Sequence, residues 1–282
     1  MPEKPTTAAG YPPDQVARVK ATCLYLATKL GDLMPELVVV GGLVPSLLID
    51  QQNLPENVTA HVGTMDLDLG LAFALVGEAR YQEVAERLRS AKFTPDKNDE
   101  GQLTRQRWRI SDPAVTVDFL IEPQNPASKP GSVFPLTKDW AAIIAPGLHL
   151  AFKNNRMIRL SGKTIVGENV EPGRDIRVCG AGAFVILKAL AFRIRGENKD
   201  AYDLFYLLRN YGRGVADVAA ELRPLLADAS AIKAMEYLRG DFQDADSTGP
   251  RRAAEFLYGR PDADTQADAV GFVRQLLDEC KL

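Results

Sequence analysis

The run Met65-Asp66-Leu67-Asp68-Leu69 places two carboxylates at alternate positions among apolar residues. Because successive side chains of a strand point to opposite faces, Asp66 and Asp68 are expected side by side on one face of a strand. Adjacent carboxylates repel each other unless a cation neutralises them, and hard divalent ions such as Mg²⁺ or Mn²⁺ prefer oxygen ligands. The pair therefore predicts a divalent metal site, although alternating acidic residues also occur on many solvated strands.

Two glycines precede this pair at the end of a β-branched run, Val38-Val39-Val40-Gly41-Gly42. At a strand-to-helix turn, Gly41 and Gly42 would let a phosphate approach the backbone N–H groups and the positive end of a helix. A glycine pair alone more often marks only a turn. Followed by metal carboxylates further along the chain, however, a phosphate cradle favours a nucleotidyl-transfer site.

A third carboxylate, Asp118, lies in the middle of an apolar, strand-like run from Val115 to Ile121. An unpaired carboxylate buried there would be costly, so Asp118 needs a partner. Two interpretations are left open. Asp118 is either a third metal-site or catalytic carboxylate, or it forms an ion pair with the preceding half-exposed strand, which carries Arg105, Arg107 and Arg109.

A lysine and an aspartate form a second candidate group. Lys188 is the single charge in an apolar helical run from Phe184 to Phe192. Lysine is rarely buried without a partner, and the ordinary alternative is that its ammonium reaches the surface. Asp203 follows on the next predicted helix, after a polar turn at Gly196, so an antiparallel helix pair would bring both residues to one end. The alternative for Asp203, compensation of the helix N-terminus, suits Asp200 in the first turn better.

The periodicity of apolar residues predicts an α+β fold that positions these groups. Strands are expected over 36–40, 65–73, 103–110 and 115–121, helices over 14–30, 44–50 and 78–91, a loop over 51–64 and a polar connection over 92–101. Short strands are expected between 133 and 179, and helices from 182 to the end. The predicted domains are a flexible leader (1–13), an α/β domain (14–180) and a helical C-terminal domain (181–282).

Length and composition are ordinary for a soluble globular protein of two domains, with 282 residues, 46% hydrophobic and 25% charged. The net charge of −3 argues against a generally basic nucleic-acid binder. The stretch 151–213 nevertheless carries 12 Lys or Arg against 6 Asp or Glu, which suits a polyanion or, equally, a solvated face. Three distant cysteines fit a reducing cytoplasm, and two histidines exclude a histidine-rich metal site. No run is long and apolar enough to suggest a membrane span, and the first residues lack a secretion signal.

Taken in chain order, the Gly41-Gly42 turn, the Asp66-Leu67-Asp68-Leu69 run, Asp118 and the block from Lys188 to Leu204 resemble a known family. They are similar to the AbiEii-type toxins of type IV toxin–antitoxin systems, including the MenT-like toxins, over roughly residues 37–209. The resemblance implies a polymerase-β-like nucleotidyltransferase core with a mixed sheet, followed by a C-terminal helical bundle. It implies transfer of a nucleotide from an NTP, with Mg²⁺ or Mn²⁺, to an RNA acceptor such as tRNA 3′ ends. It also implies a cytoplasmic protein with a cognate antitoxin encoded nearby.

The resemblance also assigns roles by position. The implied metal ligands are Asp66, Asp68 and Asp118, the implied catalytic residues are these three with Lys188 and Asp203, and the implied nucleotide-binding residues are Gly41, Gly42, Ser46 and Lys188.

The chain departs from the family pattern at several positions. Leu43 stands where the family has Ser or Thr directly after the glycines, and whether Ser46, one turn further on, substitutes for it is left open. His61 and Thr64 stand where the family often has an Arg and a Ser. Two rival functions remain: a nucleotidyltransferase that modifies a small molecule or a protein, which the near-neutral total charge suits, and an inactive nucleotidyltransferase-like binding module.

Overall fold

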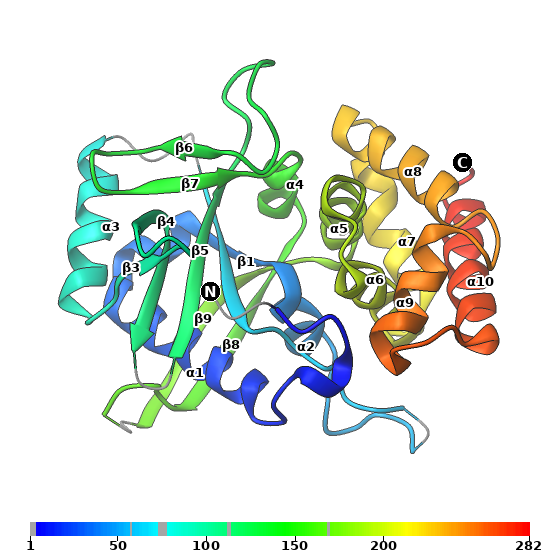
Figure 1. The fold of residues 1–282 in the computed structure, drawn as a ribbon, viewed down its shortest axis with the longest axis horizontal. Helices are drawn as coiled ribbons and strands as arrows, with labels where there is room; N and C mark the ends of the chain where they lie inside the picture. Colours follow the sequence, from blue (N-terminus) through cyan, green and yellow to red (C-terminus); the bar gives the residue numbers. More distant parts are fainter. Residues whose placement is uncertain (1–3, 57, 73–77, 112–113, 168–169) are drawn as a thin grey trace. The chain divides into compact units, whose positions relative to one another are not determined.

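A computed structural model describes residues 4–56, 58–72, 78–111, 114–167 and 170–282 of the chain (Figure 1). The fold is α+β, with a mixed sheet, and the chain divides into two compact units. The sheet unit contains residues 13–43 and 64–179, and the helical unit contains residues 4–12, 44–63 and 180–282. Residues 1–3 of the predicted leader and Phe73, the last residue of the predicted carboxylate strand, lie outside the described residues.

The sheet unit carries all the strands of the described chain. These are β1 (Leu37–Val40), β2 (Asp66–Leu71), β3 (Thr94–Lys97), β4 (Leu103–Ser111), β5 (Ala114–Ile121), β6 (Val133–Pro135), β7 (Ala141–Ile144), β8 (Asn155–Lys163) and β9 (Val170–Cys179). Its helices are α1 (Gln15–Leu30), α3 (Glu78–Ser90) and α4 (Leu148–Lys153), with short 3₁₀ turns η2 (Gly31–Glu36) and η3 (Gly41–Leu43).

The main path of the sheet runs in the order β3-β4-β5-β2-β1-β9-β8, with β7 on β5 and β6 on β7. The pairs β1–β9, β2–β5 and β5–β7 are parallel, and the others are antiparallel. All four residues of the central strand β1 are buried, which explains its unbroken β-branched run. The sheet therefore places β2, which carries Asp66 and Asp68, next to β5, which carries Asp118.

Apolar side chains fill the core of the sheet unit. Trp108 and Trp140 are fully buried, and the ring of Phe119 meets that of Trp140 edge-on at 5.0 Å between centroids. Helix α1 packs against β2, β5, β8 and β9. Leu148 of α4 lies against Gly70 of β2, where a side chain larger than hydrogen would collide with it.

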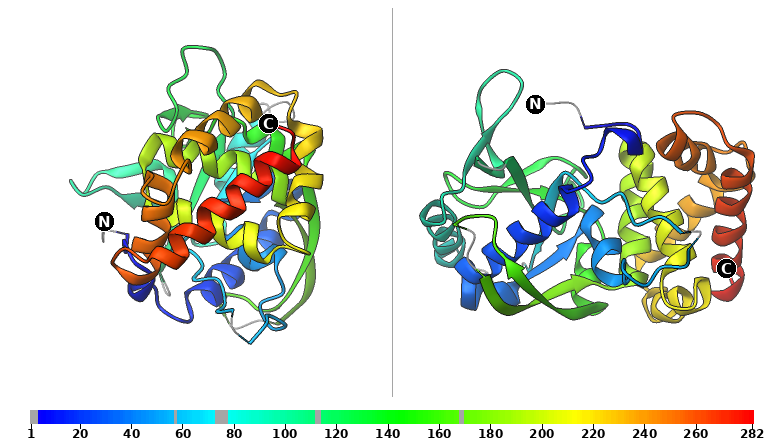
Figure 2. Two further views of the ribbon diagram at one scale, coloured as in Figure 1. Left: turned by 90° about the vertical axis from the view of Figure 1, so that its right-hand side faces the viewer. Right: turned by 90° about the horizontal axis from the view of Figure 1, so that it is seen from below.

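The helical unit contains η1 (Ala8–Gly10), α2 (Val44–Leu48), α5 (Ala181–Arg195), α6 (Asn198–Asn210), α7 (Val215–Leu222), η5 (Arg223–Leu225), α8 (Ala229–Asp241), α9 (Thr248–Tyr258) and α10 (Ala263–Glu279). The left view of Figure 2 looks onto this bundle, with α10 in red crossing it. Helix α5 is buried over most of its length, which explains its nearly uninterrupted apolar sequence.

The α5–α6 hairpin is closed by Gly196. This residue has a φ of 65° and donates its backbone N–H to Phe192 O at 2.7 Å, an arrangement typical of a helix C-terminus that ends on glycine. The resulting turn folds α6 back along α5 and fixes which faces of the two helices meet.

Three parts of the chain differ from the sequence prediction. The segment 92–101, expected as a polar connection, contains strand β3, which pairs with β4. Residues 4–12, expected as a loose leader, belong to the helical unit, because the buried ring of Tyr11 packs on Phe256 at 5.6 Å. Residues 44–63, expected within the α/β domain, also belong to the helical unit. The expected change to helix at 181 coincides with the start of α5. No helix of the described residues is long and apolar enough to cross a membrane.

Candidate functional site

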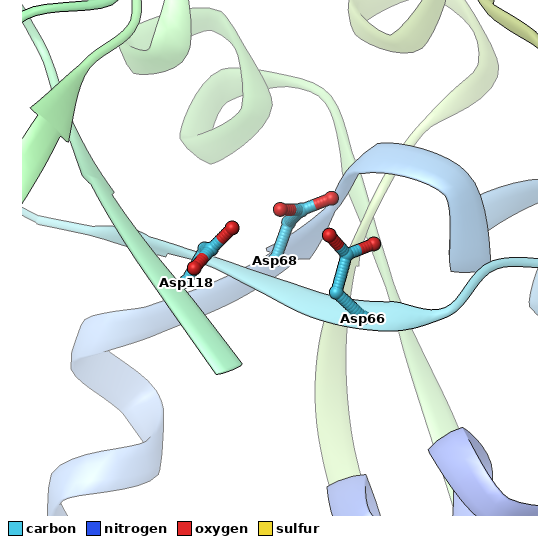
Figure 3. Close-up of side chains that lie close together, drawn as sticks. All are labelled: Asp66, Asp68 and Asp118. Atoms are coloured by element: carbon cyan, nitrogen blue, oxygen red, sulfur yellow. The ribbon is translucent and has the colours of Figure 1, made fainter. Parts of the chain in front are cut away.

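The three acidic residues singled out in the sequence lie together on two adjacent strands of the sheet unit (Figure 3). Asp68 of β2 is the register partner of Asp118 on β5, and Asp66 lies two residues before Asp68 on the same face. One carboxylate oxygen from each lies within 4.8 Å of the other two. Asp66 and Asp118 are buried and Asp68 is half-buried. The expected shared face of Asp66 and Asp68 is thus confirmed.

The two interpretations of Asp118 prove compatible. Arg107 of β4, its register partner, donates two hydrogen bonds to it, including one of 2.6 Å from Nε to Oδ1. The same guanidinium lies 3.9 Å from Oδ2 of Asp66. Hydrogen bonding to Asp118 outweighs burial and raises the pKa of Arg107, so this cation is permanent. Asp118 is therefore both an ion-pair partner and a member of the carboxylate group.

The backbone of Gly41 lies directly against the side chain of Asp68, where no larger residue would fit. Its φ is 70°, and a Cβ built on it would lie 1.9 Å from Oδ2 of Asp68. Both observations require glycine at this position. The buried Gly42 follows it in η3. The structure thus brings the glycine turn and the carboxylate pair together, whereas a phosphate contact at this turn stays a prediction.

Thr64 holds Asp66 from the same strand end. Its hydroxyl donates to Oδ1 of Asp66 at 2.8 Å, and both side chains are buried. The adjacent backbone is fixed as well, because Nε2 of Gln15 donates to Met65 O at 3.2 Å. The sequence indicated Thr64 only by its position near the pair, and the structure gives it a contact.

The donor set fits a hard divalent cation. Carboxylate oxygens are the ligands that Mg²⁺ and Mn²⁺ take in proteins, with water and substrate oxygens filling the remaining positions. The formal charge of the group also fits one divalent ion. Three carboxylates (Asp66, Asp68 and Asp118) and the guanidinium of Arg107 together carry two net negative charges, which one such ion would neutralise. This buried acidic group could hold a metal ion.

The second candidate group forms an ion network in the helical unit. Nζ of Lys188 donates to Asp200 Oδ1 at 2.8 Å and to Asp203 Oδ2 at 2.6 Å. Lys199 donates to Asp203, and Arg195 donates to Asp200 through two nitrogens. The expected meeting of Lys188 and Asp203 is confirmed. The alternative in which Lys188 reaches the surface is wrong, because its side chain is only 6% exposed.

Charge–charge attraction stabilises the ionised forms of Lys188, Asp200 and Asp203, whereas burial lowers the pKa of Lys199. Burial alone would lower the pKa of Lys188, but the charges of Asp200 and Asp203 outweigh it and raise that pKa. Burial likewise opposes ionisation of Asp200, yet Lys188 and Arg195 lower its pKa to about 2. The pKa of Asp203 is also lowered, against burial, by Lys188 and Lys199. Asp200 therefore does more than compensate a helix end.

His61 connects this network to Ser46. Its Nε2 lies 2.9 Å from Asp203 Oδ1, and its Nδ1 lies 2.8 Å from Ser46 Oγ. Since the ionised Asp203 can only accept, Nε2 carries the hydrogen and Nδ1 accepts from Ser46. The ring stacks on Tyr202 at 5.4 Å. Burial lowers the pKa of His61 to about 4, so the ring is neutral near pH 7.

Ser46 is buried, and its hydroxyl forms a hydrogen bond with His61. A nucleotide contact of Ser46 stays a prediction. Sequence reasoning missed the role of His61 because its partner Asp203 is 142 positions away.

No protein-family model matches the chain, and no curated protein matches it. The functional interpretation therefore depends on the geometry of these two groups and on the sequence resemblance.

Proposed function

We propose that the chain is a metal-dependent nucleotidyltransferase that transfers a nucleotide from an NTP to an RNA acceptor such as tRNA 3′ ends, in the manner of AbiEii-type and MenT-like toxins. The observation that carries the proposal is the group of three carboxylates on adjacent strands, in contact with a glycine turn. On this proposal the fold of the sheet unit is the polymerase-β-like core, and a cognate antitoxin is a protein partner.

The proposal assigns a role to each candidate site residue of the sheet unit. Asp66, Asp68 and Asp118 hold a divalent ion, which when bound neutralises charge on the triphosphate and on the pyrophosphate leaving group. Thr64 fixes the orientation of Asp66. The backbone of Gly41 and Gly42 approaches a phosphate.

Asp118 suits the role of ligand better than that of general base. Both of its oxygens accept charge-assisted hydrogen bonds from Arg107, which favour its ionised form. A general base must take up a proton on one of these oxygens, and Asp118 would lose the hydrogen bond to that oxygen in doing so.

Lys188 and Asp203 keep their proposed catalytic roles, Lys188 as a point charge for the triphosphate and Asp203 as the residue that orients it. The contact of 2.6 Å between them supports the orienting role. Ser46 acts in nucleotide binding through an orientation set by His61.

A single observation favours the rival inactive binding module. The guanidinium of Arg107 already places a positive charge beside Asp66 and Asp118. In a protein that had lost its metal and its activity, a basic side chain would take the place of the ion in this way. The nucleotidyltransferase that modifies a small molecule or a protein differs from the main proposal only in its acceptor.

The test is a label-transfer assay with purified protein, Mg²⁺ and each radiolabelled NTP, with and without total tRNA. Asp66→Ala and Asp68→Ala should abolish transfer and leave the metal-free melting temperature unchanged or higher, because one of three mutually repelling charges is removed. Asp139→Ala is the control, since this aspartate has a side chain that is 65% exposed. Near-wild-type transfer in either variant, or transfer without metal, would refute the site. Labelling of a protein or a small molecule instead of tRNA would show that the proposed acceptor is wrong, and the proposed nucleotidyl transfer would stand.

A further inference from the structure

Arg107 continues the row of acidic residues across the sheet. The register pairs Arg107 of β4 with Asp118 of β5, and Asp118 with Asp68 of β2. Side chains at paired positions of neighbouring strands stand on the same face, close enough to interact. The sheet thus builds a permanent cation into the same row as two of the three carboxylates.

The neighbouring arginines of β4 are engaged elsewhere. Arg105 is exposed and donates to Lys138 O, and Arg109 lies 3.6 Å from Asp96. Arg107 differs from both because its side chain is only 17% exposed and its guanidinium contacts two members of the carboxylate group.

A cation in this position has two consequences for the group. Three carboxylates with oxygens within 4.8 Å of one another repel strongly when partly buried, so Arg107 lowers the cost of folding without metal. The same positive charge repels an incoming divalent ion. It therefore stabilises the metal-free site and weakens the binding of metal by that site.

We propose that Arg107 is the internal counterion of the metal centre: its charge offsets that of Asp66 and Asp118 and lowers the affinity of the site for its divalent ion. This inference rests on the proposed metal-dependent function. On this inference a bound divalent ion would share the carboxylates with a cation that is fixed in the protein.

The experiment measures Mn²⁺ binding without NTP, by electron paramagnetic resonance of free Mn²⁺, together with melting temperatures with and without Mn²⁺. Arg107→Gln should lower the metal-free melting temperature and bind Mn²⁺ about tenfold more tightly, because a positive charge beside the ion is lost. Arg107→Lys keeps the charge and should bind Mn²⁺ with nearly wild-type affinity. Arg105→Gln, on the same strand, is the control for the change in net charge.

A second pair of variants keeps the test decisive if Arg107→Gln does not fold. Asp118→Asn leaves Arg107 beside two carboxylates, whereas the double variant Asp118→Asn/Arg107→Gln removes both ion-pair partners. The double variant should bind Mn²⁺ about tenfold more tightly than Asp118→Asn alone.

The outcomes separate this inference from the proposed function. Equal Mn²⁺ affinity with and without Arg107, in either background, would overturn the counterion role while leaving the metal site intact. Loss of Mn²⁺ binding in a folded Arg107→Gln protein would also overturn it, since Arg107 would then be essential for ligand geometry instead. Failure of the folded wild-type protein to bind Mn²⁺ would refute the proposed metal centre itself.

Discussion

Acidification from pH 7 to pH 4.5 should destabilise this protein through His61. Its side chain is completely buried between Ser46 and Asp203. Burial lowers the pKa of His61 to about 4, although Asp203 opposes this shift, and the charges of Lys199 and Lys188 add to it. In the unfolded chain the pKa of histidine is about 6.5. The unfolded chain therefore takes up the proton first as the pH falls.

The sign and size of the effect follow from this difference. Stability from neutral His61 is fully present above about pH 6.5 and is lost as the pH falls toward the folded pKa of about 4. Between pH 7 and pH 4.5 the loss is about 2 kcal/mol. The carboxylates of Asp200 and Asp203 have lowered pKa values, so their contribution is lost only below the ordinary range for aspartate, at about pH 3.8 and lower. The two windows meet only near pH 4 to 5, so most of the loss between pH 7 and pH 5 comes from His61.

The assay is urea unfolding of wild type and His61→Gln at several pH values from 7 to 4.5, followed by far-ultraviolet circular dichroism. The stability advantage of wild type over the variant should fall by about 2 kcal/mol across this range, because only wild type has the buried imidazole. Tryptophan fluorescence adds an internal control: Trp108 and Trp140 both lie in the sheet unit, so their fluorescence follows unfolding of the unit that does not contain His61. Parallel pH curves for the two proteins would show that His61 is not held neutral by burial, and would refute the reasoning.

Three further predictions concern substitutions at other positions. Gly41→Ala should abolish stabilisation by Mn²⁺ in thermal melts, because its Cβ would overlap a carboxylate oxygen, whereas Gly131→Ala, with a similar positive φ and nothing within 4 Å, should not. Lys188→Ala should cost about 3–5 kcal/mol in urea unfolding, because it removes the buried cation that Asp200 and Asp203 share; a loss below 1 kcal/mol would contradict the network. If the acceptor is tRNA, replacing Arg156 and Arg159 should reduce the slope of log affinity against log salt by about one to two. A flat salt response with retained transfer would exclude RNA as the acceptor.

The local pattern of the sequence was sufficient to predict the carboxylate pair. Alternation along a strand fixes the faces of Asp66 and Asp68 whatever the strand pairs with. The position of Asp118 depends on the parallel register between β2 and β5, and no local pattern encodes that register. For the same reason the sequence could only offer three arginines as partners of Asp118, and the antiparallel register of β4 selects Arg107.

Other features could not be predicted because tertiary packing overrides local composition. The segment 92–101 is polar and contains Pro95, which favours a connection, yet β3 forms there by pairing with β4. Residues 44–63 join the helical unit through contacts to distant parts of the chain, such as the hydrogen bond between the backbone of Val62 and the hydroxyl of Tyr202. A contact across 140 positions leaves no periodic signal in the sequence.

The two buried charge groups are balanced in different ways, and this difference bears on function. In the helical unit, Lys188, Lys199 and Arg195 face the carboxylates of Asp200 and Asp203, so charged partners within the group satisfy both acids. A buried network of this kind costs stability when one member is removed, and it holds its members in fixed positions. In the sheet unit, three carboxylates are set against the single cation Arg107, which leaves two negative charges among those four side chains. Such an imbalance is unfavourable for folding alone, but it is what a site needs if it is to bind a divalent ion and release it.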